Sequence, residues 1–311
     1  MLNLPKTDLT VYPLCLGGNV FGWSADEKES FQVLDAYFEA GGNFIDTADV
    51  YSEWKEGNVG GESESIIGKW MKARGNRSSI VLATKVAMLS TRPGLSSVNI
   101  KSAIDDSLRR LQTDYIDLYY SHQWDEKVEQ EETLSTYSEL LKAGKIRYIG
   151  ASNFTGAQLT QAMEISRKNN YPSYVALQNN YNLLHRSEFE SDAAPTVLKD
   201  EISAIPYFGL ARGFLTGKYR AGSTVESVRA GGVTDFQTPQ GYAVVDALEE
   251  IARSHSTTIS AIALAWIRSN AAVSTPIASA RTVEQLHEIM PIISLDPSEK
   301  SSLDQLSDFQ V

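Results

Sequence analysis

Short apolar runs along the chain alternate with stretches in which apolar residues recur every three or four positions. A short apolar run is typical of a strand that is buried on both faces, and the spaced pattern is typical of a helix with one apolar face. Eight such runs predict strands at 11–18, 43–45, 80–85, 115–120, 146–151, 174–177, 202–206 and 273–277.

Helices are predicted between the strands. Ser24 and Glu27 have the spacing of a capping box, which predicts that the first helix begins there. Steps of four, four and three residues separate the apolar positions between Ile100 and Leu111, and these steps mark another helix. Further helices are predicted at about 62–72, 134–141, 155–168, 196–200, 242–254 and 259–269, and from about residue 283 onward.

Strands that alternate with helices predict a parallel sheet covered by helices, and a count of eight favours closure into a (β/α)8 TIM barrel. A doubly wound open sheet is the rival architecture. It normally carries a G-x-G-x-x-G turn after its first strand, and this chain has no such turn. Without internal repeats or a linker-like segment, the sequence predicts one domain over residues 1–311, with long loops at the C-terminal mouth of the barrel.

Composition narrows the classes of partner. The chain has 28 basic and 39 acidic residues, and its net charge of −11 disfavours nucleic acid and anionic membranes as partners. The only cysteine, Cys15, precludes an intramolecular disulfide, and no apolar run is long enough for a membrane span or a signal peptide. We therefore expect a cytoplasmic protein. The four histidines are scattered, so we expect no metal site. Oligomeric state is left open.

Polar residues stand where the predicted strands end. Because the C-terminal ends of barrel strands meet at one mouth, these residues are expected to be neighbours. They are Asp46, Tyr51 just beyond it, Lys85, His122, Ser152 with Asn153, Gln178 and Tyr207.

Within this group, a lysine paired with a buried aspartate is expected to lower the pKa of a neighbouring tyrosine. Tyr51 would then donate a proton to a developing alkoxide. His122 would orient the substrate oxygen or relay the proton at lower pH. Since no side chain supplies a hydride, these residues imply a reducing cofactor.

Residues 44–51, Phe-Ile-Asp-Thr-Ala-Asp-Val-Tyr, are similar to the signature of the aldo-keto reductase superfamily, and the resemblance extends over essentially the whole chain. It implies a catalytic tetrad of Asp46, Tyr51, Lys85 and His122. It also implies that Ser152, Asn153 and Gln178 contact the nicotinamide carboxamide of NADPH or NADP+, and that Tyr207 stacks on the ring.

The resemblance further implies that residues 207–218 wrap the pyrophosphate and that the segment from Ser279 holds the adenosine half, where Arg281 suits a 2′-phosphate. Phe208-Gly209 replaces the usual serine and proline, Ser279 replaces a frequent glycine, and Ile289 replaces an asparagine. The cofactor residues implied are Gly18, Asn19, Asp46, Ser152, Asn153, Gln178, Tyr207, Phe208, Gly209, Leu210, Arg212, Gly213, Gly217, Lys218, Ser279, Arg281, Gln285 and Glu288.

The activity implied is NADP-dependent reduction of an aldehyde or ketone. The alternative is a redox-sensing subunit similar to the potassium-channel beta subunits. The start of the first strand near Val11, without a long extension, and the histidine at position 122 weigh against it. A barrel that binds a sugar phosphate without redox chemistry would not need the stacking tyrosine. The candidates for the substrate pocket are Phe21, Trp23, Trp54 and Trp124. They could form an aromatic pocket for an apolar or cyclic carbonyl compound, or for a sugar-like one. They could equally serve as packing anchors.

Overall fold

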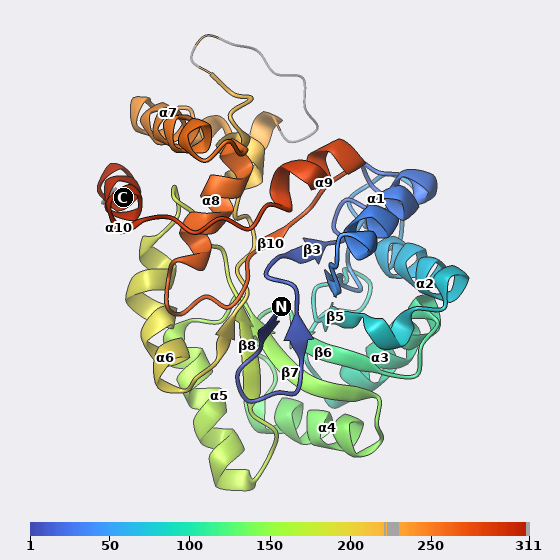
Figure 1. Ribbon diagram of the computed structural model, residues 1–311. Helices are drawn as coiled ribbons and strands as arrows, with labels where there is room; N and C mark the ends of the chain where they lie inside the picture. The colour runs from blue at the N-terminus through green and yellow to red at the C-terminus, as the bar shows by residue number, and fades with distance from the viewer. Residues whose placement is uncertain (221, 223–229, 309–311) are drawn as a thin grey trace.

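A computed structural model describes residues 1–220, 222 and 230–308, and eight parallel strands form its centre with helices around them (Figure 1). The strands follow the order β10-β3-β4-β5-β6-β7-β8-β9 around the sheet. They are β3 (Cys15–Gly17), β4 (Phe44–Asp46), β5 (Val81–Val86), β6 (Ile116–Ser121), β7 (Ile146–Ser152), β8 (Tyr174–Gln178), β9 (Ser203–Ala204) and β10 (Ile277–Ala278).

Backbone hydrogen bonds join the first and last strands of this order. The nitrogen of Ile277 donates to the Pro206 oxygen at 2.8 Å, and that of Ser274 donates to the Ala204 oxygen at 2.9 Å. The sheet therefore closes on itself, and the predicted (β/α)8 barrel is confirmed.

The helices cover the outside of the sheet. They are α1 (Glu27–Glu39), α2 (Glu62–Arg74), α3 (Ser97–Leu111), α4 (Gln130–Lys142), α5 (Gly156–Asn169), α6 (Ala194–Lys199), α7 (Pro239–Ser254), α8 (Ile259–Arg268), α9 (Val283–Ile289) and α10 (Pro297–Leu306). Short helical turns lie at Arg77–Ser79, Phe189–Ala193, Ala211–Thr216, Ala230–Gly232 and Thr234–Phe236. In the described part of the chain, no helix has the length and apolar character needed to cross a membrane.

Apolar side chains form two layers, as expected for strands buried on both faces. One layer lies between the sheet and the helices, and it includes Trp70 and Trp266. The other fills the barrel interior, and it includes Cys15, Phe44 and Tyr120. Cys15 is fully buried there and packs as a small hydrophobe.

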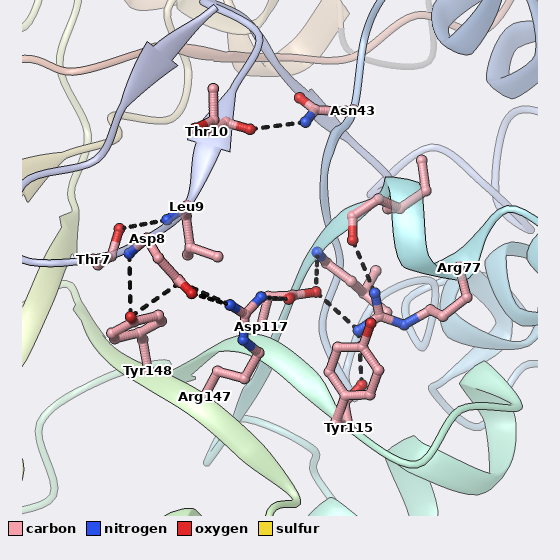
Figure 2. Close-up of polar contacts among 12 residues, drawn as sticks. Thr7, Asp8, Leu9, Thr10, Asn43, Arg77, Tyr115, Asp117, Arg147 and Tyr148 are labelled. Carbon is pink, nitrogen blue, oxygen red and sulfur yellow. Dashed lines mark hydrogen bonds and ion pairs between the residues drawn. The ribbon is translucent and has the colours of Figure 1, made fainter.

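A two-stranded hairpin, β1 (Leu2–Asn3) and β2 (Thr10–Val11), covers the N-terminal ends of the barrel strands, which we call the closed end. A chain of ion pairs fastens it (Figure 2). Arg147 donates both to Asp8 in the hairpin and to Asp117 at the start of β6, and Asp117 also accepts from Arg77. The C-terminal ends of the strands form the opposite, open end.

Three predicted elements differ from the structure. The first predicted strand, 11–18, is split into β2 and β3, because Pro13 lacks a backbone N–H and the chain turns there. The eighth predicted strand, 273–277, is mostly irregular because Pro276 interrupts it, and β10 begins only at Ile277. The capping box of α1 is formed by Asp26 and Glu29, not by Ser24 and Glu27.

Candidate active site

The four residues of the predicted tetrad come together at the open end. Asp46 is the last residue of β4, Lys85 lies near the end of β5, and His122 follows β6 directly. Lys85 Nζ lies 2.6 Å from Asp46 Oδ2 and 2.9 Å from the Tyr51 hydroxyl. The rings of Tyr51 and His122 are 6.0 Å apart between centroids, so the phenol and the imidazole lie beside each other.

Lys85 is fully buried and uses all three of its protons. It donates to Asp46 Oδ2, to the Tyr51 hydroxyl oxygen and, at 2.8 Å, to the Thr47 carbonyl oxygen. Burial lowers the pKa of Lys85, while the ion pair with Asp46 opposes this shift. Since Lys85 donates to the tyrosine oxygen, the hydroxyl proton of Tyr51 must point elsewhere. Its acceptor in the structure is Asp46 Oδ2, at a long 3.3 Å.

The electrostatics of Tyr51 differ from the prediction. Burial and the negative charge of Asp46 raise the pKa of Tyr51 well above its ordinary value of 10.0. The expected lowering of the Tyr51 pKa by Lys85 is therefore wrong, because the phenolate would lose its hydration and face a carboxylate. Tyr51 is accordingly a protonated phenol at neutral pH, which is the form that donates a proton.

His122 is also neutral. Burial and, to a smaller degree, the charge of Lys85 place its pKa well below the ordinary 6.5. A proton relay through the imidazolium is therefore not expected near neutral pH, and the orienting role remains. Its backbone is fixed on both sides, because its nitrogen donates to the Val86 oxygen and its oxygen accepts from the Asn153 side chain at 2.9 Å.

Asp46, Tyr51 and His122 of the tetrad line a cavity of about 780 Å³ at the open end. Seventeen of the eighteen predicted cofactor residues line it. The exception is Gly18, which packs behind the wall, where a Cβ would lie 2.8 Å from Ser63 Oγ. Lys85 is likewise behind the wall, with no exposed surface. The cavity also has lining residues that the sequence did not single out, namely Gly17, Val20, Val50, Met88, Ser260, Ile277 and Ala278. Thr216 and Ile289, which lie in the segments expected to hold the pyrophosphate and the adenosine half, line it as well.

The residues predicted to hold the carboxamide are connected to the tetrad. Gln178 Nε2 donates to Asp46 Oδ1 at 2.9 Å, on the carboxylate oxygen that Lys85 leaves free. Ser152 Oγ donates to the Gln178 carbonyl oxygen at 2.8 Å, and the Tyr207 hydroxyl donates to Asn153 Oδ1 at 2.7 Å. These contacts hold amide and hydroxyl groups at one side of the cavity, where a planar amide of a ligand would find both donors and acceptors.

The segment after Tyr207 has an unusual backbone. Phe208, Ala211 and Arg212 adopt positive φ angles of 56°, 45° and 57°, and Gly213 follows at 96°. Helical and left-handed residues in succession turn backbone N–H groups toward one side, which is an arrangement that binds anions. Three cationic residues of the described lining, Arg212, Lys218 and Arg281, come from this segment and from the one after β10.

This wall fits a dinucleotide phosphate. Gly17 lets Ser279 pack closely against β3, because a Cβ at residue 17 would lie 2.5 Å from Ser279 Oγ. Arg281 precedes α9, and its backbone nitrogen donates to Gln285 Oε1 at 3.0 Å. The arginine and the N-terminal turn of α9 favour a negatively charged group.

The four predicted pocket aromatics separate in the structure. Trp54 lines the cavity, with its ring 6.0 Å from that of Tyr51, and Trp23 packs edge-on against Trp54. Phe21 is fully buried in the core, and Trp124 packs on Phe154 without lining the cavity. For Phe21 and Trp124, the packing interpretation that the sequence left open is therefore the one that holds.

A buried acid close to the tetrad was not singled out from the sequence. Asp49 is 1% exposed, and neither of its carboxylate oxygens has a hydrogen-bond partner within the described residues. Burial and the nearby Glu64 raise the pKa of Asp49 to about 8, while Arg110 opposes the shift.

The described residues contain no group of three or more potential metal ligands.

The chain is similar to known proteins over nearly its whole length. The model of the Aldo/keto reductase family matches residues 13–308. The uncharacterized oxidoreductase YrpG of Bacillus subtilis is 33% identical to the chain, over 98% of the chain and 94% of the relative. Protein tas of Escherichia coli is 32% identical, over 96% of the chain and 94% of the relative. Norsolorinic acid reductase A of Aspergillus parasiticus is 31% identical, over 99% of the chain and 80% of the relative.

Proposed function

The chain belongs to the aldo/keto reductase family of oxidoreductases, and we propose that it is an NADPH-dependent carbonyl reductase with Tyr51 as its general acid. One observation carries the proposal. The Tyr51 hydroxyl, held by Lys85 and beside His122, borders the same cavity as the amide and hydroxyl groups of Ser152, Asn153 and Gln178.

The proton transfer follows from the hydrogen bonds of Tyr51. Its oxygen accepts from Lys85, so its own proton is available to an acceptor in the cavity, and the 3.3 Å contact with Asp46 is readily exchanged for a carbonyl oxygen. The raised pKa keeps the phenol protonated until then. When the proton leaves, the adjacent ammonium of Lys85 stabilises the phenolate.

The remaining residues hold the reactants. Neutral His122 hydrogen-bonds the carbonyl oxygen, while Asp46 fixes Lys85 and is itself fixed by Gln178. NADPH, when bound, would supply the hydride that reduces the carbonyl carbon. Tyr51 donates its proton to the carbonyl oxygen. Ser152, Asn153 and Gln178 orient the carboxamide, and Tyr207 provides a ring for stacking.

Arg281 is proposed to select NADPH over NADH, because a guanidinium binds a 2′-phosphate through two charge-assisted hydrogen bonds. Arg281→Ala is expected to weaken NADPH binding about 10-fold or more and leave NADH binding unchanged. A titration followed by intrinsic fluorescence measures both. Arg253→Ala, which removes an exposed arginine of α7, is the control. Equal losses for the two nucleotides would contradict the assignment.

The function itself is tested by adding aldehydes and ketones to the protein with NADPH and following the loss of NADPH absorbance. The proposal predicts saturable turnover that depends on the carbonyl compound. Nucleotide binding that survives purification, without turnover of any compound, would favour the redox-sensing subunit. A protein that binds neither nucleotide would contradict both functions.

A further inference from the structure

Two large apolar side chains at the cavity mouth remain exposed. Trp54 is 49% and Met88 is 41% exposed, and both line the cavity that contains Tyr51. They come from the loops that follow β4 and β5, the strands that carry Asp46 and Lys85. Val50 and Val20 continue the same apolar wall. A ligand body that covered these side chains would remove a substantial apolar surface from water.

The loop that carries Trp54 is held in place by its own polar groups. Ser52 Oγ donates to the Phe21 carbonyl oxygen at 2.6 Å. Asn58 Nδ2 donates to the carbonyl oxygens of Ser52, at 2.8 Å, and Gly22, at 3.2 Å. Trp54 itself packs edge-on against Trp23, with ring centroids 5.7 Å apart. The indole is therefore an exposed surface with a fixed position, which costs little conformational entropy to bind against.

The Met88 loop is tied to the same structure. The backbone nitrogen of Ser90 donates to the carboxylate of Glu53 at 3.3 Å, and the Ser90 hydroxyl donates to it as well. The two loops therefore hold each other, and they keep Trp54 and Met88 on one side of the cavity.

Charge is distributed unevenly around the cavity. The cationic residues of its described lining, Arg212, Lys218 and Arg281, belong to segments after β9 and β10. In the barrel order, these strands lie on a different side from β4 and β5. Apart from Asp46, whose carboxylate accepts from Lys85 and Gln178, the lining residues contributed by β4, β5 and the loops that follow them are Val50, Tyr51, Trp54 and Met88. Of these, Tyr51 is committed to the carbonyl oxygen. This side offers few partners for the hydroxyls of a sugar or for a carboxylate.

We propose that Trp54 and Met88 determine specificity, and that the substrate is a neutral carbonyl compound with an aromatic or cyclic apolar body. The inference rests on the proposed function, since it assumes that the carbonyl oxygen sits at Tyr51 and His122. The apolar body lies against Trp54, whose flat face suits a ring, and Met88 adapts to its outline.

Four aliphatic aldehydes test this inference at saturating NADPH: hydrocinnamaldehyde, propanal, glyceraldehyde and succinic semialdehyde. The wild-type protein is expected to have its highest kcat/KM for hydrocinnamaldehyde, which adds a neutral ring to the propanal chain. Trp54→Ala is expected to lower that value about 10-fold, mainly through KM, and to change the value for propanal less than about twofold. Met88→Ala should have a smaller effect in the same direction.

Two controls accompany the test. Trp54→Phe should restore most of the activity toward hydrocinnamaldehyde, because a ring remains. Val98→Ala removes an 81% exposed side chain of α3 that does not line the cavity, and should change nothing. A wild-type preference for glyceraldehyde or succinic semialdehyde, or an equal loss for all four aldehydes in Trp54→Ala, would overturn the inference.

A binding measurement separates this inference from the proposed function. If no aldehyde is reduced, the proposed function fails. Calorimetric titration with hydrocinnamyl alcohol then tests whether Trp54 binds the apolar body of the ligand. Binding that is lost in Trp54→Ala and kept in Val98→Ala supports this role. Binding that does not depend on Trp54 overturns it.

Discussion

Asp117 at the closed end of the barrel and Asp49 at the open end are both almost completely buried, with 2% and 1% of their surface exposed. Their surroundings differ. Asp117 accepts hydrogen bonds from Arg77, Arg147 and the backbone nitrogen of Leu82. Among the described residues, no hydrogen-bond donor reaches either carboxylate oxygen of Asp49.

The difference indicates that the two ends use buried charge for different purposes. At the closed end, every carboxylate oxygen of the ion-pair chain is paired, so the charges fasten the hairpin to the barrel (Figure 2). At the open end, Lys85 and Asp46 are paired with each other and with Tyr51, so the charges prepare one hydroxyl for chemistry. Unfavourable burial, as at Asp49, is tolerated near such a site.

The largest expected effect is a loss of activity when Lys85 at the open end is replaced. Lys85→Met should lower kcat by about 10²-fold to 10⁴-fold, because the phenolate left by proton transfer loses its neighbouring cation. NADPH affinity should change little, since Lys85 lies behind the cavity wall. Steady-state kinetics and a nucleotide titration measure the two effects. A variant with nearly normal kcat would show that Lys85 serves the fold alone.

Removing the buried carboxylate at the closed end should lower stability and leave activity unchanged. Asp117→Ala leaves two arginines without their shared carboxylate, and it should lower the free energy of unfolding by about 3 kcal/mol. The kcat of the folded fraction should be unchanged. Asp8→Ala removes the exposed end of the same ion-pair chain and should cost less than about 1 kcal/mol. Denaturant unfolding measures the free energy lost in each variant. Equal losses in Asp117→Ala and Asp8→Ala would contradict the argument that the buried carboxylate contributes more than the exposed one.

The third effect concerns Asp49 and depends on pH. Its folded-state pKa, about 8, lies above its ordinary 3.8. As pH rises between these values, the unfolded chain releases the proton first, so this residue lowers stability progressively until about pH 8. Asp49→Asn removes the titration. Its stability relative to wild type should therefore rise between about pH 5 and pH 8, by up to about 1.4 kcal/mol per pH unit.

Denaturant unfolding at several pH values measures this trend, with Asp8→Asn as an exposed control that should show no comparable rise. A stability difference that stays constant with pH would mean that Asp49 is not the strained acid described here. Together with Asp117→Ala, this variant tests whether two buried aspartates contribute to stability with opposite signs.

The architecture could be predicted because a parallel barrel imposes a simple pattern. Strands buried on both faces are continuous apolar runs, and their C-terminal ends meet, so residues as distant as Asp46 and Gln178 could be predicted as neighbours. Prolines caused the main errors in the strands. The helix α10 was missed, although Asp296 and Glu299 form a capping box at its start.

Other features of the site depend on three-dimensional surroundings that a sequence pattern does not contain. The raised pKa of Tyr51 results from its burial beside Asp46, and the raised pKa of Asp49 results from its burial near Glu64. Met88 could not be singled out because its role depends on how its loop is tied to that of Trp54. Aromatic residues near strand ends were a useful but incomplete signal, since Phe21 and Trp124 proved to be packing residues.

The most direct test of the account is the kcat of Tyr51→Phe with NADPH and an aldehyde that the wild-type protein reduces. The variant lacks only the hydroxyl that donates the proton, so kcat should fall by at least about 10²-fold while NADPH binding and thermal stability stay close to wild type. A variant that keeps nearly normal turnover would contradict the assignment of Tyr51 as the proton donor, and with it the function proposed for the open end of the barrel.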